Sequence, residues 1–469
     1  MPGQKKAAQY IAGVFKKHGL KPLGKDGSYF QPFEVEVIRS SQESNIAVTT
    51  KDSRRTFVWL NDYVAFGAPD SSVGGPAVFV GYIDFKPDSA TAARIKGRVV
   101  IALAGSRSGP RDTSDQGARR RFFAFRRDEG SLGTLVVGDP AGGSSFARIA
   151  PAIRGFVEKG QMRLQGSQGR GGMQFRSFYF TVSNDMAEAI LSSSGHTLSA
   201  LRAAAAESTF KPIFLDNATV SITHKLVREL RQSENVIGMI EGSDPELRQE
   251  YVFFTGHYDH LGKTNDGVIY HGADDDGSGT SMVLELAQAF AANPVKPKRS
   301  LVFLTVAGEE KGLLGSDYYT KNPIVPLEKT VVDLNTDMIG RTDPKHDSLK
   351  SGPYVYVIGS DKISTELDQT LGEANRETEN IAFDYQFNDE HDPNQFYRRS
   401  DHYNFAKNGI PIAFFFTGEH KDYHKPTDTI EKILFDRMIK IGHVVYYAGW
   451  KTANRPTMFK KDGEGGGYK

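Results

Sequence analysis

The sequence contains no cysteine, which excludes disulfide bonds, thiolate metal ligands and a thiol nucleophile. It also lacks an apolar run long enough to cross a bilayer, and Ile410–Phe416, one of the longest such runs, is predicted to form a buried strand. An excess of charge of one sign is missing as well, because 58 Lys and Arg residues nearly balance 57 Asp and Glu residues and the formal net charge is only +1. The electrostatics therefore give no reason to expect nucleic acid or an anionic membrane as a partner.

The chain begins without the apolar core of a signal peptide, since its first residues run directly into an amphipathic helix pattern. One basic stretch, Arg119–Arg127, interleaves arginines with phenylalanines. Apolar residues between arginines at helical spacing are typical of a helix with one packed face and one solvated face. We therefore do not assign this stretch to nucleic-acid binding. The sequence indicates no oligomeric state.

A length of 469 residues exceeds what one compact core usually holds and predicts two or three domains. Residues 1–55 are assigned to the first part of a domain that continues over residues 216–455. Between them, residues 56–215 consist of short β-rich runs with one or two helices, and this segment contains no cluster of candidate ligands. Residues 456–469, which end in a Gly-rich sequence, are predicted to be a flexible tail.

After residue 235 the sequence alternates between strand and helix patterns. The predicted strands are 235–240, 251–255, 300–306, 330–334, 354–358 and 411–416. The predicted helices are 279–292, 312–320, 362–377 and 435–453. Continuous runs of Val, Ile, Leu and Phe indicate strands that are covered on both faces. We therefore expect an α/β fold with a mostly parallel central sheet flanked by helices, with ligands bound beyond the C-terminal strand ends.

Five short motifs in this half of the chain carry residues that bind metals in proteins. They are G-H-Y-D-H at 256–260, G-A-D-D-D-G-S-G at 272–279, A-G-E-E-K-G at 307–312, L-N-T-D-M-I-G at 334–340 and D-Y-H-K-P-T-D-T at 422–429. Together they offer His257, one aspartate from 274–276, the pair Glu309–Glu310, Asp337 and His424. Imidazoles and carboxylates without a thiol suit a hydrolytic zinc site rather than a structural zinc cage.

Two metal ions need a carboxylate that bridges them and one or two further ligands on each. The aspartates at 274–276 offer the bridge, and the glycines around them allow a tight loop. Adjacent glutamates point in different directions, so one of Glu309 and Glu310 can bind a metal while the other acts as the base that activates a water molecule.

Other interpretations of these motifs are weaker. The D-D-D-G-S-G loop also suits calcium, because calcium prefers oxygen ligands. His257 and His260 have an H-x-x-H spacing without the glutamate of H-E-x-x-H, so zincin-type hydrolysis has no support. A G-x-S-x-G elbow, which a serine hydrolase would require, does not match at Gly277-Ser278-Gly279. We interpret His260 and His271 as loop residues or as groups behind the ligands.

In order and spacing, these motifs and S-D-H-Y-N-F at 400–405 resemble those of the dizinc aminopeptidases of metallopeptidase family 28. The resemblance covers essentially 235–450 and the N-terminal helix pattern. It implies a three-layer α/β sandwich with a mostly parallel central sheet, the zinc exopeptidase fold. The segment 56–215 resembles, in position and β-rich texture, the protease-associated domain often inserted in this family, which implies an inserted α+β domain.

The resemblance implies two bound Zn²⁺ ions. His257 and Asp337 would bind one ion, and Glu310 and His424 would bind the other. Asp275 would bridge the two ions, because the family's ligand is the middle acid, two residues before the glycine of D-G-S-G.

The resemblance also implies three catalytic roles. Glu309 would be the general base that later delivers a proton to the leaving amine. Asp259 would be the carboxylate that orients His257. Tyr423 would be the phenol that stabilises the oxyanion of the tetrahedral intermediate.

The implied reaction is the removal of N-terminal residues from peptides by a zinc-dependent hydrolase. A carboxypeptidase or dipeptidase of the same fold is one alternative, since Arg398 and Arg399 could bind a substrate carboxylate, but we interpret them as a surface pair. A non-catalytic peptide-binding scaffold is another, and the complete ligand set argues against it. Side-chain preference is expected to come from loops around 380–400. Relatives with the inserted domain are usually exported, so we expect an extracytoplasmic protein, periplasmic or secreted, whose signal segment is not part of this chain.

Overall fold

The computed structural model describes residues 2–65, 67–106, 130–139, 145–167, 178–264, 266–347 and 352–463. The chain divides into two compact units. The larger unit comprises Met1–Val35, Arg163–Ser167 and Arg231–Lys469, and the smaller unit comprises Glu36–Met162 and Gln168–Leu230. The basic stretch Arg119–Arg127 lies outside the described residues.

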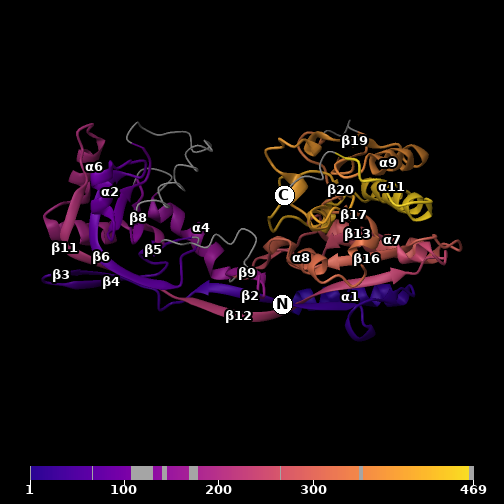
Figure 1. The fold of residues 1–469 in the computed structure, drawn as a ribbon, viewed down its shortest axis with the longest axis horizontal. Helices are drawn as coiled ribbons and strands as arrows, with labels where there is room; N and C mark the ends of the chain where they lie inside the picture. The colour runs from indigo at the N-terminus through magenta and orange to yellow at the C-terminus, as the bar shows by residue number, and fades with distance from the viewer. Residues whose placement is uncertain are drawn as a thin grey trace. The chain divides into compact units, whose positions relative to one another are not determined.

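A 10-stranded sheet runs through the larger unit (Figure 1). Its strand order is β19-β18-β20-β17-β13-β16-β12-β2-β9, and β1 pairs with β12 beside this path. In chain order the strands are β1 (Lys21–Pro22), β2 (Phe30–Ser40), β9 (Gln161–Leu164), β12 (Leu226–Ile240), β13 (Tyr251–His257), β16 (Ser300–Val306), β17 (Thr330–Thr336), β18 (Tyr354–Ile358), β19 (Ala382–Asp384) and β20 (Ile412–Phe416).

Four neighbouring strands of this sheet, β16, β13, β17 and β20, run parallel to one another. The register between β13 and β16 runs from Tyr251 opposite Ser300 to His257 opposite Val306. β12 and β18 are antiparallel to β16 and β20, so the sheet is mixed with a parallel centre. Because parallel strands end at the same edge, the residues that follow these four strands meet there.

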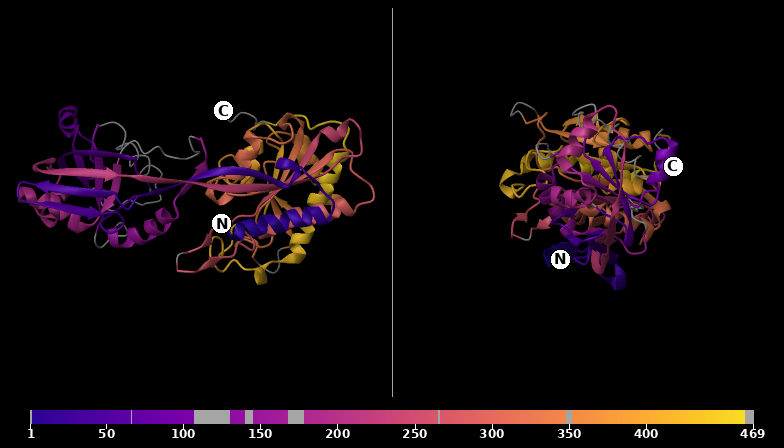
Figure 2. Two further views of the ribbon diagram at one scale, coloured as in Figure 1. Left: turned by 90° about the horizontal axis from the view of Figure 1, so that it is seen from below. Right: turned by 90° about the vertical axis from the view of Figure 1, so that its left-hand side faces the viewer.

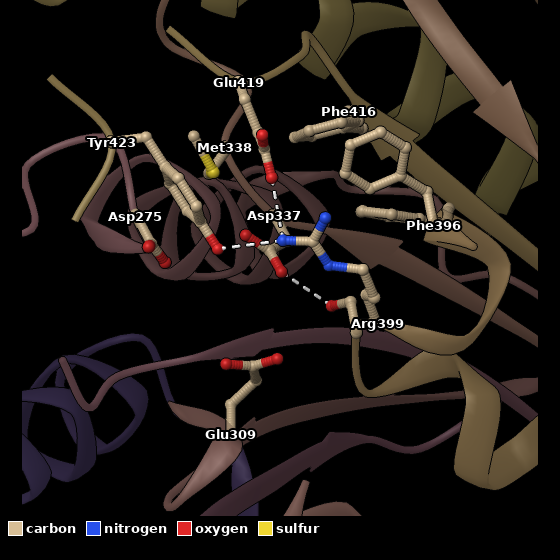
Figure 3. Close-up of a pocket in the computed structure, with 11 residues that line it drawn as sticks. Asp275, Glu309, Asp337, Met338, Phe396, Arg399, Phe416, Glu419 and Tyr423 are labelled. Carbon is tan, nitrogen blue, oxygen red and sulfur yellow. Dashed lines mark hydrogen bonds and ion pairs between the residues drawn. The ribbon is translucent and has the colours of Figure 1, made fainter. Parts of the chain in front are cut away.

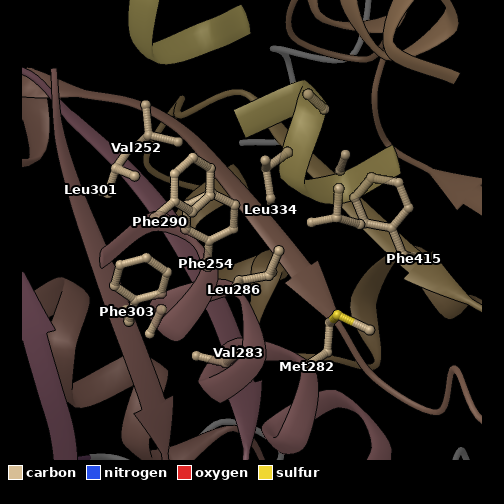
Figure 4. Close-up of a cluster of buried hydrophobic side chains, with 14 of the residues drawn as sticks. Val252, Phe254, Met282, Val283, Leu286, Phe290, Leu301, Phe303, Leu334 and Phe415 are labelled. Atoms are coloured by element: carbon tan, nitrogen blue, oxygen red, sulfur yellow. The ribbon is translucent and has the colours of Figure 1, made fainter. Parts of the chain in front are cut away.

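Helices pack on both faces of the sheet. They are α1 (Pro2–Lys17), α7 (Gly277–Ala292), α8 (Leu314–Lys321), α9 (Thr365–Glu377), α10 (His402–Ala406) and α11 (Phe435–Asn454). On one face Phe254 of β13 packs against Phe290 of α7 and Phe303 (Figure 4). On the other face Phe253 packs against Tyr319 of α8 and Phe405 of α10. Neighbouring strand residues point to opposite faces, so these two contacts show that both faces are covered. No described helix has the length and apolarity needed to cross a membrane.

The elements predicted from the apolar runs are present, and β16 and β18 have the predicted bounds. β13 and β17 extend further than predicted, to His257 and Thr336. The added residues are polar or glycine, but they continue the parallel pairing, as Gly256 lies opposite Thr305 and His257 opposite Val306. Backbone pairing with a neighbouring strand therefore determines where these strands end, and apolar composition does not.

The smaller unit contains an 8-stranded sheet of order β4-β3-β11-β6-β7-β8-β10-β5. Its strands are β3 (Asn45–Thr50), β4 (Arg54–Val58), β5 (Tyr63–Val64), β6 (Ser71–Tyr82), β7 (Val99–Leu103), β8 (Gly133–Val137), β10 (Phe178–Val182) and β11 (Ile213–His224). Its helices are α2 (Ser89–Ile95), α4 (Phe146–Lys159), α5 (Asn184–Leu191) and α6 (Leu198–Ala206). Buried residues such as Phe79, Phe180 and Val220 give this unit a core of its own.

The smaller unit is longer than the predicted inserted segment 56–215. β3 pairs with both β4 and β11, so Asn45–Thr50 belongs to the smaller unit. β11 continues to His224, beyond the predicted end. Its first and last boundaries lie after Val35 and after Leu230, within β2 and β12, and Arg163–Ser167 inside the predicted segment belongs to the larger unit. Each of these strands continues through its boundary without a turn, so the sequence pattern carries no signal at that point.

The described part of the tail is packed against the larger unit. Phe459 is buried in its core, and the Lys460 backbone N–H donates to Glu366 over 3.1 Å. The Thr365 backbone N–H donates to Asp462 over 3.0 Å. The predicted flexible tail is therefore wrong for residues 456–463, and residues 464–469 lie outside the described residues.

Candidate metal centre

The motifs with metal-binding residues meet at the edge where the parallel strands end. His257 is the last residue of β13, and Asp337 directly follows β17. After β16 the chain makes one turn of 3₁₀ helix at Glu309–Lys311. Gly308, before this turn, has a φ of 80°, a left-handed conformation that favours glycine. This turn brings the Glu309–Glu310 pair to the strand end.

Asp275, from the loop before α7, lies between two imidazoles. Its Oδ1 is 3.3 Å from His257 Nε2, and its Oδ2 is 3.2 Å from His424 Nε2. His424 Nε2 is also 3.2 Å from Glu310 Oε2, and His257 Nε2 is 3.7 Å from Asp337 Oδ2. A carboxylate with a different imidazole at each oxygen has the arrangement that a ligand bridging two metal ions requires.

Two groups of donor atoms are close enough together to hold one cation each. The first group consists of His257, Glu309 and Asp337, and the second consists of His260, Asp275 and Glu310. Within each group the atoms lie within 4.8 Å of one another. Four of the five predicted ligands fall in these groups. His260 enters the second group because its Nδ1 lies 2.7 Å from Glu310 Oε1. His424 contacts the same two carboxylates from its own loop, so two imidazoles face this pair.

Several polar atoms of the site are buried without a hydrogen-bond partner in the described protein. They include His257 Nε2, Asp275 Oδ2 and Glu310 Oε1, whose short contacts with other donor atoms of the site lack the geometry of a hydrogen bond. Buried polar atoms are nearly always satisfied, and these three belong to residues of the two donor groups. The donor set of imidazole nitrogens and carboxylate oxygens suits zinc, so the residues fit the cofactor that the sequence predicts.

The charges of the site favour a cation. Burial alone would raise the pKa of Asp275, but the imidazoles of His257 and His424 lower its pKa below the usual range. Burial alone would lower the pKa of His424, but its contacts with Asp275 and Glu310 raise the pKa to about 9. The negative potential that stabilises the proton on this imidazole would also stabilise a metal ion bound to the imidazole in place of the proton.

The carboxylate of Asp276 accepts hydrogen bonds from the backbone at both of its oxygens. Its Oδ2 accepts from the His257 N–H over 3.0 Å. Its Oδ1 accepts from the N–H groups of Gly279, in the first turn of α7, and of Met338. The carboxylate thereby joins the ends of β13 and β17 to the start of α7.

The carboxylate of Asp274 also has a partner at each of its oxygens. Its Oδ1 accepts from the Gly340 N–H over 2.7 Å, and its Oδ2 lies 3.2 Å from His420 Nε2. Asp428 then holds the loop from outside, because it accepts from the N–H groups of both Asp274 and Asp275. Of the three consecutive aspartates, Asp275 alone directs its carboxylate toward the imidazoles of both predicted ligand histidines.

Asp259 supports the site in two ways. His257 Nδ1 lies 3.0 Å from the Asp259 carbonyl oxygen, whereas the carboxylate is 3.8 Å away. The carbonyl accepts from Nδ1–H, which leaves Nε2 with the lone pair that a metal ligand needs. The carboxylate instead accepts from the N–H groups of Gly308 and Glu309 over 2.7 and 3.1 Å. Asp259 therefore orients His257 through its backbone and positions Glu309 through its side chain.

Glu309 lies within the site, with Oε2 at 3.8 Å from His257 Nε2. Burial raises its pKa well above the usual range, and the nearby carboxylates of Asp337 and Asp401 raise it further. A carboxylate with a raised pKa can hold a proton at neutral pH, as a general base needs to do after it has accepted one.

Residues 235–449 match the sequence model of Peptidase family M28. These residues form a domain of peptidase family M28. The M28 domain begins in β12 and ends in α11, so it contains all five predicted ligands and the three predicted catalytic residues.

Curated relatives of this chain include peptidases. Aminopeptidase YwaD of Bacillus subtilis (strain 168) is 30% identical over 240 residues, which cover 49% of this chain and 47% of that protein. A probable zinc metalloprotease of Pyrenophora teres f. teres (strain 0-1) is 30% identical over 264 residues, covering 48% of this chain and 52% of that protein. The chain thus spans about half the length of these curated relatives.

Solved structures share the fold. An aminopeptidase from Aneurinibacillus sp. strain AM-1 aligns with a TM-score of 0.54 and 20% identity, covering 98% of this chain and 91% of that chain. BSAP, a zinc aminopeptidase from Bacillus subtilis, aligns with a TM-score of 0.52 and the same identity and coverage. At this identity the likeness concerns the fold, and the coverage extends it over both compact units.

Tyr423 of the M28 domain lies next to the predicted ligand His424, with its ring stacked at 3.9 Å between centroids. Its hydroxyl oxygen accepts from Arg399 Nη2 over 3.1 Å. Burial raises the pKa of Tyr423, so the phenol stays protonated and can donate a hydrogen bond. Figure 3 shows its hydroxyl pointing into a recess beside Asp337.

Several residues of the site had no assigned role in the sequence. Ser400 donates to Asp337 Oδ2 over 2.7 Å and accepts from Asn335 Nδ2, so it orients a predicted ligand. Arg399, interpreted above as a surface residue, lines the recess together with Glu419. The S-D-H-Y-N-F motif marked the position of Ser400, but no pattern linked Arg399 to Glu419, which lies on another loop.

Proposed function

We propose that the M28 domain is a zinc-dependent exopeptidase that removes N-terminal residues from peptides. The observation that carries this proposal is the position of Asp275, whose two carboxylate oxygens face His257 and His424 at 3.3 and 3.2 Å. Glu309 stands beside this group as a candidate base. Relatives named aminopeptidase and zinc metalloprotease support hydrolytic zinc chemistry.

We assign His257 and Asp337 to one zinc ion, Glu310 and His424 to the other, and Asp275 to both. Bound zinc ions would polarise the scissile carbonyl and lower the pKa of a water molecule held between them. The contacts of Asp275 with both imidazoles support a count of two ions.

Glu309 accepts the proton of the attacking water and later donates it to the leaving amine. Its backbone is held by Asp259, which keeps the carboxylate at the end of β16. Tyr423 donates a hydrogen bond to the oxyanion that forms at the carbonyl carbon. Arg399 already donates to the phenol oxygen, so the phenolic O–H is free to point at the substrate.

Recognition of the substrate's α-amine is the part of the proposal that separates an aminopeptidase from its alternatives. Three carboxylates, Asp275, Glu309 and Asp337, line the recess and suit a cation. Arg399 in the same recess favours a carboxypeptidase or dipeptidase as a second candidate, because a guanidinium binds a carboxylate. Its ion pair with Glu419 at 2.8 Å weighs against that candidate.

Three finer assignments belong to this proposal. The larger unit is a three-layer sandwich of the zinc exopeptidase type, which the helices on both faces of its sheet support. The smaller unit is a protease-associated-like domain, which its mixed sheet and helices support. The protein acts outside the cytoplasm, which fractionation of the native host can test.

The proposal is tested with aminoacyl reporter substrates beside N-blocked peptides. We expect cleavage of the free aminoacyl substrates, loss of activity after treatment with a chelator, and recovery after addition of zinc. Metal analysis of the active protein should give about two ions per chain. Cleavage of N-blocked peptides from the C-terminus would replace the aminopeptidase with the carboxypeptidase, and a chain that binds metal without any hydrolysis would be a scaffold.

A further inference from the structure

The recess beside the metal ligands is lined by acidic and by apolar side chains (Figure 3). Its apolar lining consists of Met338, Phe396, Phe414 and Phe416. Its polar lining consists of Asp275, Glu309, Asp337, Arg399, Ser400, Glu419 and Tyr423. Because it adjoins the predicted ligands, a peptide bound there for hydrolysis would direct the side chain of its first residue toward the apolar lining.

Arg399 is the one cation among the residues that line this recess. Its Nη2 donates to Glu419 Oε1 over 2.8 Å and to Tyr423 over 3.1 Å. The guanidinium also lies 4.7 Å from the ring centre of Phe396. The next residue, Ser400, is bonded to Asp337. These contacts fix a positive charge at the wall of the recess.

The residues directly before and after Glu419 hold its backbone in place. Gly418 before it has a φ of 96°, and a Cβ at that position would meet Asp343 Cβ at 2.5 Å. His420 after it places Nε2 at 3.2 Å from Asp274 Oδ2. The carboxylate therefore stands beside Arg399 without help from a substrate.

The ion pair with Glu419 neutralises the positive charge of Arg399, which an acidic side chain of the substrate would need as its partner. With Glu419 present, a substrate carboxylate would share one guanidinium with a resident carboxylate and would face the acids of the site as well. An apolar side chain meets the aromatic lining and leaves the ion pair intact. Selectivity of this kind arises from a repulsive element as much as from an attractive one.

We propose that Glu419 is a specificity determinant, which neutralises Arg399 so that the recess rejects an acidic first residue and accepts an apolar one. The proposal rests on the aminopeptidase activity proposed above. It assigns to Glu419 no part in metal binding or in proton transfer.

The experiment compares kcat/KM for Leu-, Phe-, Glu- and Lys-p-nitroanilide between the zinc-loaded wild type and Glu419→Gln. We expect the ratio of Glu to Leu turnover to rise about fivefold in the variant, the size of effect that one partly exposed charge contributes. Glu419→Asp keeps the charge and should keep the ratio of the wild type. The double variant Arg399→Gln/Glu419→Gln should lose the gain, since the freed cation is gone.

Glu373→Gln is the matched control, because Glu373 pairs with Lys451 on an exposed surface away from the recess. An unchanged Glu to Leu ratio in Glu419→Gln, with metal content and melting temperature like those of the control, would overturn the proposal. A selective loss of Lys-p-nitroanilide cleavage would also overturn it, because Glu419 would then bind basic side chains directly. A wild type that cleaves none of the four substrates would instead refute the proposed function.

Discussion

Each carboxylate of the loop Asp274–Asp276 has its own neighbours, so substitutions should separate their effects. Asp275→Asn removes the charge between His257 and His424 but keeps the volume of the side chain. We expect bound zinc to fall to less than about half of the wild-type amount, because an amide is a poor bridging ligand. The metal-free variant should unfold at the same denaturant concentration as the metal-free wild type. Metal analysis and urea unfolding measure the two effects.

Asp276→Ala should show the opposite pattern. It leaves the buried N–H groups of His257, Gly279 and Met338 without their acceptor. A buried donor without a partner costs about 1–3 kcal/mol, so we expect the free energy of unfolding to fall by at least about 2 kcal/mol even without metal. Urea unfolding of the metal-free protein checks this. Wild-type stability of the variant would contradict the structural role of Asp276.

A substitution at Glu309 should impair proton transfer without impairing metal binding. Glu309→Gln keeps the backbone bond to Asp259 and removes the group that accepts a proton from water. We expect kcat to fall about a hundredfold to ten-thousandfold, the range for loss of a general base, with about the same zinc content. Glu328→Gln, at an exposed position, is the control. Activity close to that of the control would show that another group is the base.

His402 gives stability a dependence on pH. The ring is buried, stacks on Phe414 and donates from Nε2–H to the Tyr397 carbonyl over 2.9 Å. Burial lowers its pKa to about 3, whereas an unfolded histidine has a pKa of about 6.5. Between these two pH values His402 is protonated in the unfolded chain and neutral in the folded protein.

This histidine should therefore lower the free energy of unfolding as the pH falls below about 6.5, by about 1.4 kcal/mol per pH unit. His402→Phe keeps the stacking and removes the titration. We expect the variant to show a shallower loss of stability between pH 6.5 and 4.5 than the wild type, measured by urea unfolding at several pH values. Parallel curves for the two proteins would exclude His402 as the source.

At the scale of the elements, the sequence predicts the parts of the site that follow apolar strands. His257 and Asp337 end or follow strands whose apolar runs are readable, and parallel pairing then brings them together. The choice of Asp275 needed either a family resemblance or the backbone contacts of its neighbours, because three equal side chains stand in a row.

The parts that sequence could not predict depend on contacts between loops. His260 reaches Glu310 across two motifs, and Glu419, in the loop after β20, pairs with Arg399, which lies shortly before α10. No periodicity or spacing encodes such pairs, since each partner is an ordinary polar loop residue by itself. The boundary of the smaller unit was missed for a related reason, because β2 and β12 continue through it as regular strands.

The loop after β20 supports the loop before α7 through Asp428, which accepts from the N–H groups of Asp274 and Asp275. Asp428→Ala should loosen the loop that carries the bridging ligand. We expect zinc affinity to fall about 10–100-fold, the usual effect of losing a residue that orients a ligand. Competition with a fluorescent zinc chelator measures the change. Asp436→Asn, at an exposed position in α11, is the control and should bind like the wild type.

At the scale of the whole molecule, the chain has two separate cores. The larger unit buries residues such as Phe254, Phe290 and Phe303, and the smaller unit buries a different set around Phe79 and Phe180. The predicted ligands lie only in the larger unit. Because each unit has a core of its own, we expect each to unfold in its own cooperative transition.

Calorimetry should therefore resolve two transitions, of which metal affects one. A ligand that binds only the folded larger unit raises the stability of that unit alone. We expect a chelator to lower one melting temperature by at least about 5 °C, as a loss of a few kcal/mol does in a unit of this size, and to leave the other unchanged. Asp275→Asn, which should bind less zinc, should show a smaller shift on addition of the chelator than the wild type does. A single transition that moves as a whole would show that the two units unfold together.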